Sequence, residues 1–422
     1  MDARPVATLS GHAKAVWSCA SASHDGRTLL ASASGDRTLK LWDAAARACV
    51  ATLSGHASSV YGCAFSPDGG TLASASGDRT TKLWDVATRA CVATLVGHAD
   101  WLRSCVFSSD GKTLASASGD KTLRLWDVAT ATCVATLSGH AEYVNSCAFS
   151  PDGKTVASAS DDRTLKLWDA ATHRSVATLH GHADWVRGCA FSPDGKTLAS
   201  ASADKTVKLW HVADATCEAT LSGHAGSVNS CAFSPDGTTL ASASSDATLK
   251  QWDVATRTCM ATLNGHANAV SGCAYSPDGT TLASVGGDNA LMLWDAAAAS
   301  AAFRASAGAA EAAARGKAAA AAAKAAAEKP VVDWLTKHGL QRYVRAIIDD
   351  LGAARVADLL QLEASDLTAA GFTVGDVNRF LDAAAKEEAA ARAAAAARSR
   401  EAWRRTPRDN AAGGGATGPS AA

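Results

Sequence analysis

One feature of this chain constrains its fold more than any other: a unit of about 42 residues that recurs seven times. A Gly-His pair near the start of each unit supplies His12, His56, His98, His140, His182, His224 and His266. A tryptophan near the end supplies Trp42, Trp84, Trp126, Trp168, Trp210, Trp252 and Trp294. Self-similarity at one period predicts equal structural units that are too small to fold alone and bury their apolar faces against their neighbours.

Each unit has the pattern of four short strands separated by turns. In the second unit the expected strands are Val60–Phe65, Thr71–Ser76, Thr80–Trp84 and Cys91–Leu95. Pro67-Asp68-Gly69 and Gly77-Asp78 lie between the first three of them, and these residue types favour tight turns. The sequence therefore predicts seven small four-stranded sheets in a mainly β region.

The order of motifs in each unit resembles the WD-repeat (WD40) family: Gly-His, a second strand rich in serine, an aspartate turn and a final Trp-Asp. The resemblance implies a seven-bladed β-propeller over residues 1–295. The seventh unit ends at Trp294-Asp295 without a fourth strand, whereas Pro5–Leu9 repeats the missing Val-Ala-Thr-Leu. We therefore expect the N-terminal segment to pair with the seventh blade and close the ring, which leaves no open sheet between the two ends.

The repeated histidine, aspartate and tryptophan suggest a catalytic or metal site, but the resemblance implies a structural role. It places a His, a Ser or Thr, an Asp and a Trp in one buried hydrogen-bond network per blade, here His56, Ser74 or Ser76, Asp78 and Trp84. The aspartates of the seven networks are Asp36, Asp78, Asp120, Asp162, Asp204, Asp246 and Asp288. The fifth unit has His211 where the others have Asp after Trp, so we expect a weaker turn there.

The 12 cysteines follow the same period. Seven occupy one position of the first strand, and five begin the fourth strand. No two have the spacing of a zinc knuckle or a redox motif. We expect small buried apolar fillers, no metal site, no disulfide framework and a reducing compartment, cytoplasmic or nuclear.

Most differences between the units flank the valine that follows Gly-His. In the family these positions face the top surface around the central channel, which implies a candidate partner-binding surface of Trp17, Tyr61, Trp101, Arg103, Tyr143, Asn145, Asp161, Trp185 and Arg187. Exposed aromatic and arginine side chains are typical of the energetic centre of protein interfaces. The alternative is that these rings only pack against neighbouring loops.

The amino-acid composition of the chain changes after the repeats. Residues 296–329 are alanine-rich and predict a helical linker that Pro330 ends. Residues 330–386 carry Trp334-Leu335, Gly339-Leu340, Tyr343 and Gly371-Phe372 in short apolar segments, and they resemble a sterile alpha motif (SAM) domain, a small all-α bundle. Residues 387–422 form an Ala/Arg/Gly-rich tail, expected to continue the last helix and then to be disordered.

SAM domains often pair through an acidic surface that meets the start of the last helix. The candidates here are Asp349, Asp350 and Asp358 opposite Arg379 and Lys386. Ordinary solvated charge is the alternative interpretation. The basic residues usual after the glycine that corresponds to Gly375 are sparse, with Arg379 standing alone, which favours protein pairing over RNA binding.

Charge and motifs limit the remaining function classes. With 40 basic and 41 acidic residues the formal net charge is −1, so no general basic field attracts nucleic acid or anionic lipid. No signal peptide, membrane span, phosphate loop, nucleophile elbow or zinc-protease motif is recognisable. The sequence favours a non-catalytic scaffold without cofactor, which binds a protein or peptide on the propeller and pairs with SAM domains. Alternatives are an adaptor that recruits substrates to a ubiquitin ligase, a weak nucleic-acid-binding scaffold and, least favoured, an enzyme.

Overall fold

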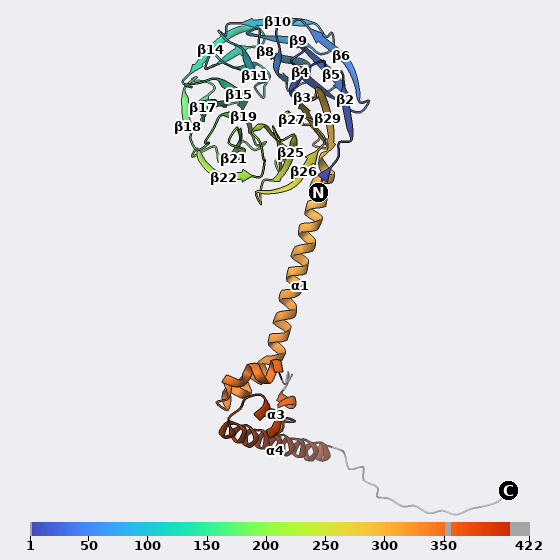
Figure 1. Ribbon diagram of the computed structural model, residues 1–422, viewed down its shortest axis with the longest axis vertical. Helices are drawn as coiled ribbons and strands as arrows, with labels where there is room; N and C mark the ends of the chain where they lie inside the picture. The colour runs from blue at the N-terminus through green and yellow to red at the C-terminus, as the bar shows by residue number, and fades with distance from the viewer. Residues whose placement is uncertain (1, 351–355, 406–422) are drawn as a thin grey trace, which may run out of the picture. The chain divides into compact units, whose positions relative to one another are not determined.

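The repeat region folds into a closed ring of seven sheets around a central channel (Figure 1). The computed structural model describes residues 2–350 and 356–405, and their side chains except for residues 2, 3, 298–314, 349, 350, 357 and 402–405. Consecutive sheets contact each other through their innermost strands, and the last contacts the first. The predicted seven-bladed β-propeller is confirmed.

Each blade has four antiparallel strands, which follow one another in the sequence in every blade except the seventh. The innermost strands are β3 (Val16–His24), β7 (Val60–Phe65), β11 (Leu102–Phe107), β15 (Val144–Phe149), β19 (Val186–Phe191), β23 (Val228–Phe233) and β27 (Val270–Tyr275). The second strands are β4 (Arg27–Ser34), β8 (Thr71–Ser76), β12 (Thr113–Ser118), β16 (Thr155–Ser160), β20 (Thr197–Ser202), β24 (Thr239–Ser244) and β28 (Thr281–Gly286).

Two outer layers complete the blades. The third strands are β5 (Thr38–Asp43), β9 (Thr80–Asp85), β13 (Thr122–Asp127), β17 (Leu165–Asp169), β21 (Thr206–His211), β25 (Thr248–Asp253) and β29 (Ala290–Asp295). The outermost are β6 (Ala48–Ser54), β10 (Cys91–Val96), β14 (Thr132–Ser138), β18 (Ser175–Leu179), β22 (Thr216–Ser222), β26 (Thr258–Asn264) and, in the seventh blade, β2 (Ala7–Ser10).

The hydrophobic cores lie between blades. One such core joins Ala31 and Leu41 of the first blade to Val60, Leu72 and Trp84 of the second. The alanines of the second strands are fully buried, and their small size lets the large side chains of the next blade pack closely. Each blade therefore depends on its neighbours for a core, as the repeat pattern predicts.

The N-terminal segment closes the ring. Strand β2 pairs antiparallel with β29 from Ala7 opposite Leu293 to Ser10 opposite Ala290, and the two lie side by side in Figure 1. Leu9 is buried in the core between the seventh and first blades. The expected pairing is confirmed. A further strand, β1 (Asp2–Ala3), adds in parallel to the outer edge of β26, which the repeat pattern did not predict.

The chain divides into two compact units, Met1–Ala307 and Gly308–Ala422. Helix α1 (Ala296–Lys337) continues through Pro330, so the expectation that this proline ends the helix was wrong. Pro330 and Ala326, whose carbonyl loses its helical partner, are both exposed, so water can satisfy that carbonyl. The turn after Pro330 buries Val331 and Leu335, which favours continuation of the helix.

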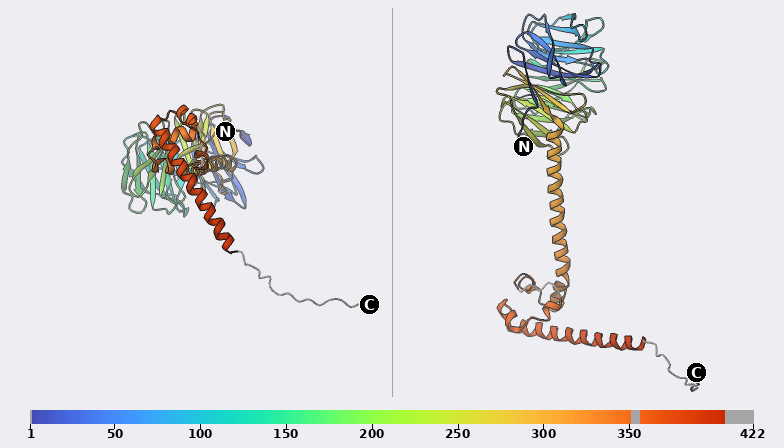
Figure 2. Two further views of the ribbon diagram at one scale, coloured as in Figure 1. Left: turned by 90° about the horizontal axis from the view of Figure 1, so that it is seen from below. Right: turned by 90° about the vertical axis from the view of Figure 1, so that its right-hand side faces the viewer.

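The second unit is a small helical bundle with its own core. After α1 come a 3₁₀ turn (Gln341–Tyr343), a π-helical turn (Ala346–Asp350), α2 (Val356–Leu359), α3 (Ala364–Ala369) and the long α4 (Val374–Arg405), which Figure 2 shows as one uninterrupted helix. The ring of Trp334 packs edge-on against Phe380, and Tyr343 stacks on Phe372 at 3.6 Å. The apolar spacing therefore forms a helical core, and α4 extends well into the segment expected to be a tail.

Candidate functional site

A β-bulge sets the orientation of the variable side chain on each innermost strand. In the third blade Leu102 pairs with Ser118 and Ser104 with Ala117, so Arg103 is the extra residue. The same shift occurs in the other six blades and makes Trp17, Tyr61, Asn145, Arg187, Asn229 and Ser271 the extra residues. A bulge kinks the strand and redirects its side chain. Seven side chains of five kinds are thereby presented at one end of the channel.

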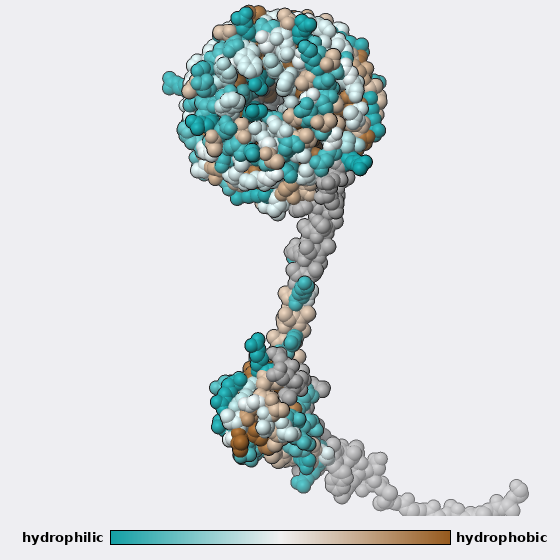
Figure 3. Space-filling view, viewed as in Figure 1, coloured by the Kyte–Doolittle hydropathy of each residue, from teal (hydrophilic) through white to brown (hydrophobic). Residues whose placement is uncertain are grey.

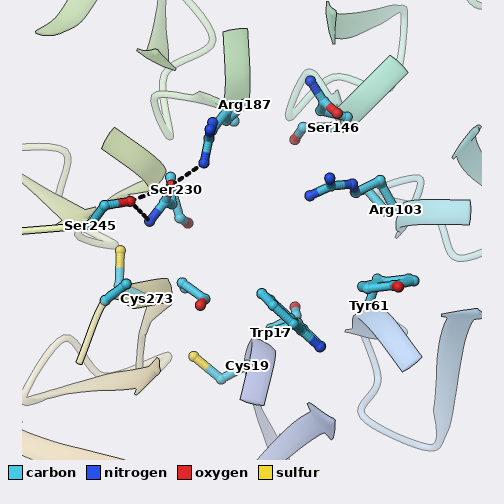
Figure 4. A pocket seen from close by; sticks show the side chains of 17 residues that line it. Trp17, Cys19, Tyr61, Arg103, Ser146, Arg187, Ser230, Ser245 and Cys273 are labelled. Carbon is cyan, nitrogen blue, oxygen red and sulfur yellow. Dashed lines mark hydrogen bonds between the residues drawn. The ribbon is translucent and has the colours of Figure 1, made fainter. Parts of the chain in front are cut away.

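These side chains line a cavity of about 260 Å³ at the channel mouth. Figure 4 shows Arg103 and Arg187 extending toward its centre, with Trp17 and Tyr61 at its side. Serine side chains, among them those of Ser104, Ser146 and Ser230, also line it. The ring face seen in Figure 3 is hollowed at its centre, with hydrophilic side chains around the hollow.

Four aromatic rings form a continuous arc along one side of this mouth. Successive ring centroids are 5.9 Å apart from Trp17 to Tyr61, 5.6 Å from Tyr61 to Trp101 and 5.8 Å from Trp101 to Tyr143. Tilted and edge-to-face contacts at this spacing are favourable. The structure therefore brings the predicted aromatic residues of blades one to four together, whereas Trp185 of blade five makes no ring–ring contact within the described residues.

The arc is packed on one side and open on the other. A Cβ atom at Gly119 would lie 2.4 Å from Nε1 of Trp101, so this ring rests on the glycine of its own blade. Yet Trp17 and Tyr143 are each 39% exposed and Trp185 is 49% exposed. The rings thus contact neighbouring turns and still offer apolar surface to a partner.

The two arginines have different surroundings. The guanidinium of Arg103 lies 4.7 Å from the ring centroid of Trp101 and 5.8 Å from that of Tyr61. It makes no hydrogen bond or ion pair with any residue that the structure describes. Arg187 donates from Nη1 to Oδ1 of Asn229 at 2.8 Å and lies 6.0 Å from the ring of Trp185. Both keep donors available toward the cavity.

Asn145 and Asp161 are bound within the protein. The amide of Asn145 donates to Oδ1 of Asp161 at 2.6 Å and to the carbonyl of Val186 in the next blade at 2.9 Å. Asn145 is 8% exposed, so it mainly links two blades. Burial raises the pKa of Asp161, although the Asn145 hydrogen bond and the charges of Arg103 and Arg187 oppose this. Asn229 repeats the arrangement with Ser245 and Val270.

The expected network is present in every blade, and its hydroxyl belongs to the first of the two candidate serines. In the second blade Trp84 Nε1 donates to Ser74 Oγ at 2.8 Å, Ser74 Oγ lies 2.7 Å from His56 Nε2, and His56 Nδ1 lies 2.7 Å from Asp78 Oδ2. Ser76 instead donates to the carbonyl of Ser59. Since a carboxylate only accepts, His56 carries its proton on Nδ1 and accepts at Nε2 from the serine.

This constellation has the distances of a hydrolytic Ser-His-Asp triad, but the environment is that of a structural element. Ser74 is fully buried and its oxygen is occupied by Trp84, so no substrate reaches it. Burial lowers the pKa of His56, which keeps its ring neutral despite the nearby Asp78. Burial alone would raise the pKa of Asp36 in the first blade, but hydrogen bonds from Thr38, His12 and Ala13 lower it to about 2.

The cysteines correct one expectation. The seven on the innermost strands are buried, and desolvation raises the pKa of, for example, Cys63 to about 12. The five that begin outer strands are exposed, so the prediction of buried fillers was wrong for Cys49, Cys91, Cys133, Cys217 and Cys259. These five cysteines lie at the start of the outermost strand of a blade, at the outer edge of the ring. All twelve thiols are unpaired.

Two departures from the repeat form pairs. Gln251 replaces the leucine of other third strands, and its amide lies 3.3 Å from the hydroxyl of Tyr275, which replaces phenylalanine in the next blade. In the fifth blade His211 Nδ1 lies 2.9 Å from Asp214 Oδ1, and Asp214 accepts from Thr216, so this turn is held by other groups. Comparison of the repeat units shows the unusual residues, but it does not show which side chains they contact, so neither pair was predicted.

The helical unit places its candidate pairing residues as follows. Arg379 pairs with Asp376 of its own helix at 3.1 Å, and Asp376 also accepts from Tyr343 at 2.8 Å. Lys386 is exposed and Asp358 is half-buried. The side chains of Asp349 and Asp350 lie outside the described residues. The structure thus engages Arg379 internally.

Among the described residues, no group of three or more His, Cys, Asp or Glu side chains is arranged to hold a metal ion. No described helix combines the length and apolarity needed to cross a bilayer.

The repeat region matches the model of a known protein family. The family model described as "WD domain, G-beta repeat" matches seven consecutive segments: residues 3–43, 47–85, 89–127, 131–169, 173–211, 215–253 and 257–295. Together the segments cover more than half of the chain, and each corresponds to one repeat unit. No curated protein matches the chain.

Proposed function

Because this chain belongs to the WD40 repeat family, whose propellers typically serve as protein-interaction scaffolds, we propose that it binds a protein or peptide at the channel mouth and acts as a non-catalytic adaptor. The arc of aromatic rings is the observation that carries the proposal. It places Trp17, Tyr61, Trp101 and Tyr143 in contact with one another at a surface that still exposes Trp17 and Tyr143.

The composition of this surface supports a protein partner. Large rigid rings offer contact area at little cost in conformational entropy, and arginine adds directional donors. Blades six and seven contribute only small side chains to the same cavity, with Asn229 and Ser271 at the bulge positions. The proposed footprint therefore lies over blades one to five.

The helical unit supplies the second part of the proposal. Residues 330–386 would act as a SAM-like module that pairs with another module of its kind. Since Arg379 is engaged by Asp376, the exposed Lys386 is the better candidate for contact with an acidic partner surface. An adaptor that recruits substrates to a ubiquitin ligase is a special case of the same arrangement. Five exposed unpaired thiols favour a reducing compartment, cytoplasmic or nuclear.

The test compares two triple variants of the full chain in affinity capture. One replaces Trp101, Tyr143 and Trp185 with alanine; the control replaces Val92, Val134 and Val176, which are exposed on outer strands, with alanine. We expect partners captured by the wild type to be lost from the aromatic variant and kept by the valine variant, with circular dichroism and melting temperature close to wild type. Lost stability with unchanged capture would show that the rings only pack against loops.

A further inference from the structure

We infer that the channel mouth accepts one anionic group of its partner, a carboxylate or a phosphate, between Arg103 and Arg187. This inference rests on the proposed function and adds the chemistry of the bound residue. The anionic group would lie in the cavity inside the aromatic arc, and the residues of the partner on either side of it would contact the arc.

Position is the first argument. Arg103 and Arg187 are bulge residues of β11 and β19, two blades apart, and both line the same cavity. The bulge residue between them, Asn145, is short and has its amide engaged by Asp161 and Val186. The two guanidinium groups therefore extend toward a common space, as Figure 4 shows.

Unused donors are the second argument. Arg103 has no hydrogen-bonded or ionic partner in the described part of the chain and is held by the rings of Trp101 and Tyr61. Arg187 uses Nη1 for Asn229, which fixes its direction. A guanidinium carries five donors in a planar fork that matches a carboxylate or a phosphate.

The local charge is the third argument. The charges of Arg103 and Arg187 both act on the carboxylate of Asp161, yet no ion pair within 4.0 Å joins it to either of them in the described residues. Asp161 is already hydrogen-bonded to Asn145, and the nearby Glu142 is paired with Lys121 at 3.5 Å, so the two guanidinium charges are only partly balanced. The mouth keeps an excess positive charge that a bound anion would balance.

Size and competition argue against a cationic ligand. Arg103 already occupies the face of Trp101 at 4.7 Å, so an incoming lysine would meet a like charge on the ring it would need. A volume of about 260 Å³ admits one or two side chains but no folded domain. We therefore expect an acidic residue flanked by apolar residues that contact the arc.

The experiment measures peptide binding to the full chain by fluorescence anisotropy. Four labelled peptides share an N-acetylated, C-amidated Ala-Leu-X-Leu-Ala frame in which X is glutamate, phosphoserine, glutamine or lysine. We expect one or both of the acidic peptides to bind about tenfold tighter than the glutamine peptide. The two acidic peptides separate a carboxylate site from a phosphate site.

Four variants locate the site. Arg103→Gln and Arg187→Gln should each weaken binding of the preferred acidic peptide roughly tenfold. Arg174→Gln is the matched control, because Arg174 is exposed between β17 and β18, at the end of its blade opposite the turn that joins β16 to β17. Arg187→Lys keeps the positive charge and should retain part of the affinity for the acidic peptide. Such retention would show that Arg187→Gln loses affinity through the missing charge and not through a folding defect.

Equal binding of the glutamate, phosphoserine and glutamine peptides, or no binding by either acidic peptide, overturns the inference. So does an acidic preference that survives both glutamine variants. Tighter binding of the lysine peptide would assign the mouth to a cation instead. If the aromatic variant still loses its partners in affinity capture while no acidic preference exists, the proposed function stands and only this inference fails.

Discussion

Removing one hydroxyl from the interior of a blade tests whether the Ser-His-Asp constellation is structural. In Ser74→Ala, Trp84 Nε1 loses its acceptor at 2.8 Å and His56 Nε2 loses its partner at 2.7 Å. Ser74 is fully buried, His56 is 7% exposed and Trp84 2%, so no bulk water replaces the oxygen. The variant therefore leaves two polar groups unpaired in a nearly dry site.

The magnitude follows from those two groups. Each buried unpaired group costs about 1–3 kcal/mol, so the loss of both partners should lower the free energy of unfolding by roughly 2–6 kcal/mol. At about 2–4 °C per kcal/mol the melting temperature should fall by about 4–24 °C. The change in stability would be measured by thermal and urea unfolding of the full chain, with the β-sheet signal in circular dichroism as the readout.

A matched serine gives the control. Ser109 is exposed in the turn between β11 and β12, so Ser109→Ala should change stability by less than about 0.5 kcal/mol. A loss below about 1 kcal/mol in Ser74→Ala, or equal losses in the two variants, would refute the structural interpretation of the network.

Three further expectations concern single substitutions and pH. Thr81→Val should stabilise the propeller by about 1 kcal/mol in urea unfolding, because the buried Thr81 hydroxyl has no partner in the described structure; destabilisation would contradict this. Gly119→Ala should displace the Trp101 ring and weaken partner capture, whereas Gly26→Ala, at a glycine with open space and φ of +73°, should cost stability without affecting capture. Burial lowers the pKa of the network histidines His12, His56, His182, His224 and His266 below 6.5, and hydrogen bonding lowers that of Asp36 to about 2. Both kinds of shift stabilise the fold at high pH. The histidine contribution is fully present above pH 6.5 and is lost as the pH falls below that value, whereas the Asp36 contribution is lost between about pH 4 and 2. Scanning fluorimetry should therefore show a melting temperature that already declines from pH 7 to 5, and a flat profile over that range would exclude the histidine contribution.

The repeat made most of the propeller predictable. Equal spacing of the Gly-His and Trp positions sets the number of blades, and the copy of Val-Ala-Thr-Leu near the N-terminus identifies the closing strand. The same regularity shows which positions vary, so the aromatic and arginine residues of the mouth could be selected before the structure was known. Their grouping around one cavity follows from the ring.

Interactions between different units were not predictable from a single repeat. Gln251 and Tyr275 lie in neighbouring blades, and each looks like an isolated substitution until the blades are packed together. Burial at the ring's outer edge was also misjudged, because Cys91 begins a strand as regular as the others but has no neighbour on its outer side. The bulge that directs Arg103 inward depends on register, which the strand pattern leaves open.

The helical region was predictable in its apolar spacing but less so at its boundaries. Pro330 was read as a stop signal, yet burial of Val331 and Leu335 outweighs the single missing hydrogen bond. The role of Arg379 depended on Asp376, three residues earlier, whose engagement by Tyr343 comes from tertiary contact.

The most direct test of the central claim is hydrogen exchange of the full chain alone and saturated with a partner identified by affinity capture. The account predicts slower amide exchange on partner binding in the loops that precede β3, β7, β11, β15 and β19 and in the first residues of these strands, where the bulges present their side chains. Protection confined to the outermost strands β6, β10, β14, β18 and β22, or to the opposite end of the channel, would contradict it.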